Sequence, residues 1–144
     1  EGGKVFAQVK IEILRQMPIK ITKPENQIPF INLVDYILYL HNRESAQLFP
    51  HTANDLIASY FEDVLNMMVY ELYFEDHMKS TGIDVLQFIY PNPIEKLKHR
   101  KDIEKEIQKF YLWLQTPDNQ VRQRINIVDI KSPEILSKIN LATQ

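Results

Sequence analysis

Two apolar segments with helical spacing, residues 29–40 and 55–78, constrain the fold of this chain more than any other feature. Steps of three and four residues place side chains on one face of an α-helix. Such steps separate Phe30, Leu33, Val34, Ile37, Leu38 and Leu40 in the first segment, and Ile57, Phe61, Val64, Met68 and Leu72 in the second. Two helices joined by a short polar break bury these faces by packing antiparallel. The sequence therefore predicts a helical hairpin in a mainly α fold.

Capping and breaking residues give the expected ends of these two helices. Pro29 is placed where the first turn of a helix tolerates proline. Thr52 together with Asp55, or Asn54 itself, is the expected cap of the second helix. Gly82 follows that helix and is expected to end it.

Three pairs of a capping residue and a proline follow, and each predicts a helix start: Asn92-Pro93, Thr116-Pro117 and Ser132-Pro133. Apolar stripes support the first two helices, with Leu97, Ile103, Ile107, Phe110, Tyr111 and Leu114 in one and Val121, Ile125 and Val128 in the other. Residues 125–131 also alternate as a strand would, so a strand stays open there. Before the hairpin, residues 5–11 and 18–21 form a short β-like segment that would need strand partners.

Composition bounds the class of protein. A chain of 144 residues with 44% hydrophobic and 25% charged residues is typical of one globular domain. No apolar run approaches the ~20 residues of a bilayer span, so no membrane partner is expected. The chain has no cysteine, which excludes disulfides and thiolate metal sites and suits a cytoplasmic location.

A basic run after residue 95 is the best candidate for contacting phosphate, and it consists of Lys96, Lys98, Arg100 and Lys101. Such residues supply affinity that does not depend on DNA sequence. The alternative is a solvated helix start, in which Asp102, Glu104 and Glu106 form ion pairs along the helix.

Two acidic patterns are candidates for metal chemistry. Pro117-Asp118 followed by Asp129 and Lys131 fits a short nuclease pattern, in which carboxylates on neighbouring strands share one Mg²⁺. The same pattern arises by chance, and a helix start explains the first half of it.

The other acidic pattern is a cluster at the end of the long helix, formed by Glu71, Glu75, Asp76 and His77. His77 is displaced from the face that Glu71 and Glu75 share, and no further Glu-x-x-His pattern completes a di-metal site. A solvated helix face is therefore the expected role, and no metal site is predicted.

Three segments, residues 9–21, 27–40 and 63–74, together resemble the C-terminal, TaqI-like specificity region of type II restriction-modification adenine-specific DNA methyltransferases and endonucleases. The matching residues are Pro18, Ile19, Pro29, Phe30, Ile31, Leu33, Val34, Asp35, Ile37, Leu38, Val69, Tyr70, Glu71, Leu72 and Tyr73. Relatives usually carry a glycine soon after the last of these, where this chain has Phe74. The catalytic Asn-Pro-Pro-Tyr-type motif and the cofactor loop of that family do not occur in this sequence.

The resemblance implies that residues 1–24 are the tail end of a target-recognition domain and that residues 25–144 are a helical C-terminal domain. It implies a non-catalytic role beside double-stranded DNA and upstream methyltransferase and recognition domains. S-adenosylmethionine, and Mg²⁺ if the parent protein cleaves DNA, would bind outside this chain, which needs no cofactor itself. The oligomeric state stays open. Two rivals remain, a helical protein-interaction or scaffold module and a metal-dependent nuclease fragment.

Overall fold

The computed structural model describes residues 24–91 and 100–131, and this part of the chain is mainly helical, as predicted. Its elements are α2 (Pro24–His41), α3 (Asn54–Tyr73), α4 (Glu75–Ser80), α5 (Leu86–Ile89), the 3₁₀ turn η1 (Arg100–Asp102), α6 (Ile103–Leu114) and α7 (Gln120–Lys131). These residues form no β-strand, only one isolated bridge between Phe49 and Thr52. The predicted β-like segment and the cap signals at Asn92-Pro93 and Ser132-Pro133 lie outside the described residues.

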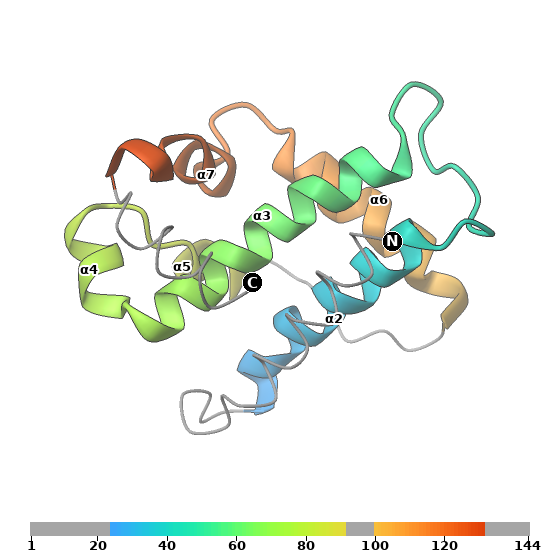
Figure 1. Cartoon of the computed structure of the whole chain (residues 1–144). Helices are drawn as coiled ribbons and strands as arrows, with labels where there is room; N and C mark the ends of the chain where they lie inside the picture. Colours follow the sequence, from blue (N-terminus) through green and yellow to red (C-terminus); the bar gives the residue numbers. More distant parts are fainter. Residues whose placement is uncertain (1–23, 92–99, 132–144) are drawn as a thin grey trace.

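Helices α2 and α3 run side by side in opposite directions, which confirms the predicted hairpin (Figure 1). Most residues of the predicted apolar faces form the core between them: Phe30, Leu33, Ile37, Leu40, Ile57, Phe61, Val64 and Met68 are at most 2% exposed. The prediction is wrong for Leu38, which is 37% exposed. At the loop end of the hairpin, His41 lies between two carboxylates of α3. Its Nδ1 is 3.2 Å from Asp55 Oδ1 and its Nε2 is 3.0 Å from Glu62 Oε1.

The start of α2 lies earlier than predicted. The helix begins at Pro24, so that this proline takes the first position, where its missing N–H is harmless. Pro29 lies inside the helix, where it removes one hydrogen bond from an early turn. Phe30, the next residue, is buried, and its burial stabilises this turn although the hydrogen bond is missing.

The predicted caps of α3 are wrong. Ala53 is the N-cap residue, and its position has no side-chain cap bond. The Asn54 side chain instead braces the loop between the helices. Its Nδ2 donates to the Ala46 carbonyl at 2.9 Å, and its Oδ1 accepts the Leu48 N–H at 3.2 Å. The side chain that the sequence predicts as a helix cap therefore forms its hydrogen bonds within the loop instead.

The predicted long second helix is two helices. α3 ends at Tyr73, and Phe74 leaves helical geometry with φ −131° and ψ 45° before α4 begins. Gly82 ends α4, as predicted, with φ +71°. The Ile83 N–H donates to the Met78 carbonyl at 3.0 Å and the Gly82 N–H to the Lys79 carbonyl at 3.2 Å. This pair of bonds is the Schellman arrangement, in which glycine tolerates the positive φ.

The first turn of α7 corrects another predicted start. Thr116 and Pro117 lie in a turn, and the helix begins at Gln120. Asn119 is the capping residue, since its Oδ1 accepts the Arg122 N–H at 3.0 Å. The segment 125–131, which also alternates as a strand would, is helical.

Helix α6 packs across α3 through aromatic contacts. The rings of Phe61 and Phe110 are 5.2 Å apart, and those of Tyr60 and Tyr111 are 6.2 Å apart. Phe49, in the loop before α3, also contacts Tyr111, with the ring centres 5.0 Å apart. Ile103, Ile107, Phe110 and Leu114 are at most 7% exposed, so that the described part of the predicted stripe faces the core.

Candidate functional site

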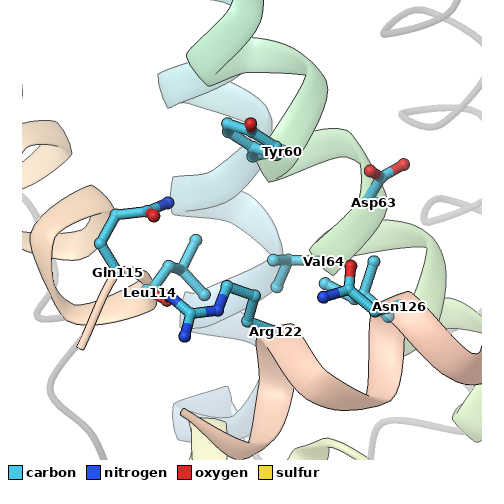
Figure 2. Close-up of a pocket in the computed structure, with 8 residues that line it drawn as sticks. Tyr60, Asp63, Val64, Leu114, Gln115, Arg122 and Asn126 are labelled. Atoms are coloured by element: carbon cyan, nitrogen blue, oxygen red, sulfur yellow. The ribbon is translucent and has the colours of Figure 1, made fainter. Parts of the chain in front are cut away.

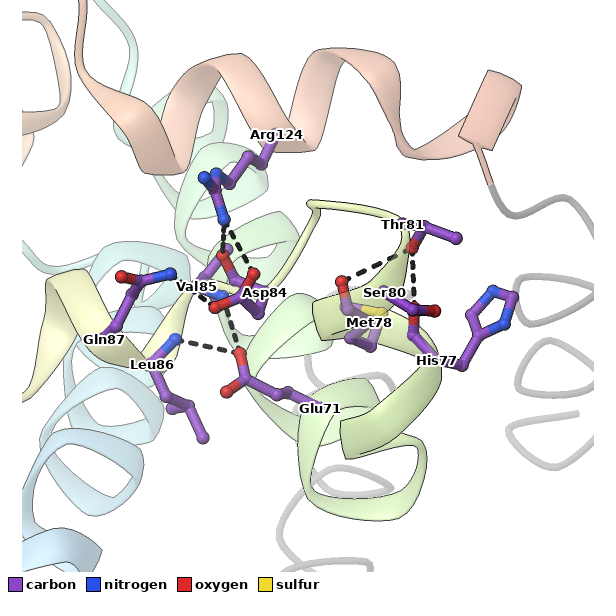
Figure 3. A network of polar contacts seen from close by, with 10 residues as sticks. All are labelled: Glu71, His77, Met78, Ser80, Thr81, Asp84, Val85, Leu86, Gln87 and Arg124. Atoms are coloured by element: carbon purple, nitrogen blue, oxygen red, sulfur yellow. Dashed lines mark hydrogen bonds and ion pairs between the residues drawn. The ribbon is translucent and has the colours of Figure 1, made fainter.

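A network of buried and half-buried polar groups lies where α3, α5 and α7 meet (Figure 3). Glu71, near the end of α3, is 4% exposed. Its Oε1 accepts the backbone N–H groups of Val85 at 2.6 Å and Leu86 at 2.9 Å. A carboxylate in this place satisfies the free N–H groups at the start of α5. Burial raises the pKa of Glu71, while the two N–H bonds partly offset that effect.

Asp84 and Arg124 complete this polar junction. One guanidinium nitrogen of Arg124 donates to the Asp84 carbonyl at 2.6 Å and to its Oδ1 at 2.9 Å. Gln87 donates to the other carboxylate oxygen at 2.5 Å. The Arg124 guanidinium also lies 4.7 Å from the centre of the Phe88 ring, within cation–π range. Together these contacts hold α7 against the segment that follows α4.

The predicted acidic cluster does not converge. Glu71 faces α5, whereas Glu75 is exposed and pairs with Lys79 at 2.7 Å. Figure 3 shows His77 pointing away from Glu71. No group of three metal-ligating side chains occurs within the described ranges. The expected solvated face is therefore wrong for Glu71, which is a buried structural acceptor, and is confirmed for the exposed residues Glu75 and Asp76.

Stability should depend on pH through Glu71. Its folded pKa is raised, so the folded state holds the proton more tightly than the unfolded state does. The free energy of unfolding should therefore fall as pH rises from about 4.5, the value for an unperturbed glutamate, through the raised pKa. Glu71→Gln should flatten this fall. Urea titrations of both proteins between pH 4 and 8 measure the difference, and parallel curves would contradict it.

A small groove lies between α3, α6 and α7 (Figure 2). Its volume is about 200 Å³, and its lining residues are Tyr60, Asp63, Val64, Leu114, Gln115, Arg122, Ile125 and Asn126. Arg122 donates to the Leu114 carbonyl at 3.2 Å, at the end of α6, where a cation favours the helix dipole. Pockets for small ligands usually have about 300–1,000 Å³. The size and the Arg122 contact indicate a helix-packing seam.

The structure places only part of the predicted basic run. Lys96 and Lys98 lie outside the described residues. Arg100 begins η1, and Lys101 follows it with an exposed side chain. The run therefore leads directly into the first turn of α6.

The residues of the nuclease pattern do not come together. Asp118 lies in the turn before α7 with φ 60°, and residues 129 and 131 are at the far end of that helix. With a rise of about 1.5 Å per residue, the start of α7, which follows Asp118, and residue 129 are more than about 13 Å apart along the helix axis. The pattern requires neighbouring strands, and this segment is a helix.

Sequence reasoning did not identify the Asp84–Arg124 contact or the capping role of Glu71. The contact joins residues 40 positions apart and leaves no local pattern. Glu71 has no distinguishing signal either, because acidic residues are common on helix faces. A detectable signal did exist for two further exposed lysines, Lys105 and Lys109, which continue from Lys101 at steps of four.

In the described part of the chain, no helix has the length and apolarity required to cross a membrane. The comparisons with known proteins identify no relative: no family model, no curated protein and no solved structure matches this chain.

Proposed function

We propose that this chain is the non-catalytic, helical C-terminal region of a restriction-modification adenine-specific DNA methyltransferase. In this role it supports the target-recognition domain and contacts the backbone of double-stranded DNA. The flipped adenine and S-adenosylmethionine belong to the upstream catalytic domain, and so does Mg²⁺ if the parent protein also cleaves DNA.

The observation that carries this proposal is that six motif residues of the resemblance, in α2 and at the end of α3, lie together in the core of the hairpin. Phe30, Leu33, Val34, Ile37, Val69 and Tyr70 are each at most 6% exposed. The motif residues Ile31, Leu38 and Tyr73 are exposed, and Pro18 and Ile19 lie outside the described residues. The motif glutamate, Glu71, closes the next turn of the chain through two backbone N–H bonds.

The break after α3 lies at a departure from the family pattern. Relatives are expected to carry a glycine soon after the motif that ends at Tyr73, and glycine interrupts helices readily. In this chain the helix stops at that place although Phe74 occupies it. The residue at this place therefore differs from the expected pattern.

Exposed apolar side chains on α2 favour a scaffold as the alternative function. Ile31 is 53% exposed and Leu38 is 37% exposed. Seven residues apart, they lie on the same side of the helix. In the first proposal this side faces the recognition domain, and in the alternative it binds an unrelated protein.

Duplex-DNA binding by the full chain tests the first proposal. Affinity should fall steeply between about 50 and 200 mM salt, because each phosphate contact releases counterions. The variant Lys98→Glu/Arg100→Glu/Lys101→Glu should bind at least about tenfold more weakly at about 50 mM salt, given that three phosphate contacts are lost. Lys79→Glu, an exposed reversal beside Glu75, is the control and should bind as the wild type does. Absence of binding at the lower salt concentration, with self-association that does not depend on salt, would favour the scaffold.

A further inference from the structure

The lysines of η1 and α6 lie on one exposed side of this segment. Lys101, Lys105 and Lys109 are all exposed, and their steps of four residues place them along one side. The opposite side of α6 is its buried apolar stripe. In the described part of the chain, no ion pair engages any of these three lysines.

One acidic residue of α6, Glu104, contacts α2. Glu104 accepts a short hydrogen bond from the Tyr39 hydroxyl. Burial, and next the negative charge of Glu106, raises the pKa of Tyr36 on the same helix α2. Asp102, Glu104 and Glu106 are each half-buried. The alternative from the sequence, in which these acids form ion pairs with the lysines along the helix, does not hold for the described residues, because none of the three lysines is in an ion pair.

The spacing of the lysines suits a nucleic-acid backbone. A step of four residues rises about 6 Å along an α-helix, so the three lysines span about 12 Å. One strand of duplex DNA presents a phosphate about every 3.4 Å of helix axis, and this span covers about three or four of them. Flexible lysine side chains act as point charges that follow such a row without reading bases.

We propose that the outward face of η1 and α6, formed by Lys101, Lys105 and Lys109, binds the sugar-phosphate backbone of duplex DNA. This inference rests on the proposed function and extends it to Lys105 and Lys109, beyond the basic run found in the sequence. A lipid surface suits this face less well. Membrane-bound helices bury an apolar face in the bilayer, and that face of α6 is inside the protein core.

Salt-dependent binding of a labelled DNA duplex of about 20 base pairs tests the proposal with two charge-matched variants of the full chain. Lys105→Gln/Lys109→Gln removes two charges from this face. Lys79→Gln/Lys131→Gln removes two exposed charges elsewhere and is the control. Far-ultraviolet circular dichroism checks that both keep the helical content of the wild type.

Three phosphate contacts predict that wild-type affinity falls at least about 40-fold between about 50 and 200 mM salt. In Lys105→Gln/Lys109→Gln, the slope of log affinity against log salt should decrease by about two, while the control keeps the wild-type slope. If both variants bind the duplex with the same slope of log affinity against log salt, this inference is overturned and the proposed function is not. If the wild type does not bind the duplex, both this inference and the proposed function are overturned. The same holds if it binds phosphatidylserine vesicles and not the duplex.

Discussion

Phe61→Ala should lower the free energy of unfolding by about 3 to 5 kcal/mol, the usual loss for a large aromatic residue in a core. Phe61 is fully buried in α3. Its ring is 6.1 Å from that of Tyr36 in α2 and 5.2 Å from that of Phe110 in α6. Truncation therefore leaves a cavity where three helices meet, and both aromatic contacts are lost.

Equilibrium unfolding in urea measures this effect, and Leu56→Ala is the matched control on the same helix. Leu56 is 48% exposed, so its truncation should change stability by less than about 1 kcal/mol. Equal losses in the two variants would contradict the assignment of the core between α2, α3 and α6.

Glu71→Ala should lower the free energy of unfolding by about 2 to 5 kcal/mol, because it leaves the N–H groups of Val85 and Leu86 buried without an acceptor. Glu71→Gln keeps a carbonyl oxygen in the same place and should lose less than about 1 kcal/mol at neutral pH. The contrast separates the acceptor role from the charge. Urea unfolding at neutral pH measures both variants, and equal losses would show that the two hydrogen bonds are not what stabilises the turn before α5.

Periodicity predicted the helices because it reports directly which side chains share a buried face. Phe30 and Leu33 in α2, like Ile107 and Phe110 in α6, are buried as their spacing indicates. The helix ends were harder to predict. Asn54 and Pro117 have the right chemistry for a helix start, but one braces a loop and the other lies in a turn.

The site was less predictable than the fold, for a physical reason. The contact of Arg124 with Asp84 forms only after α7 packs against the segment following α4, and neither residue carries a local sign of it. The lysines are different. The spacing of Lys101, Lys105 and Lys109 is visible in the sequence, but the structure is required to show that all three are exposed and that Glu104 bonds to Tyr39 of α2.

The reading frame upstream of Glu1 tests most directly whether this chain is the C-terminal region of an adenine-specific DNA methyltransferase. Genomic DNA around the coding region would be sequenced and translated in the same frame. The proposed function predicts an Asn-Pro-Pro-Tyr-type motif in a preceding catalytic domain. A frame that opens directly before this chain, or one that encodes an upstream domain without that motif, would contradict it.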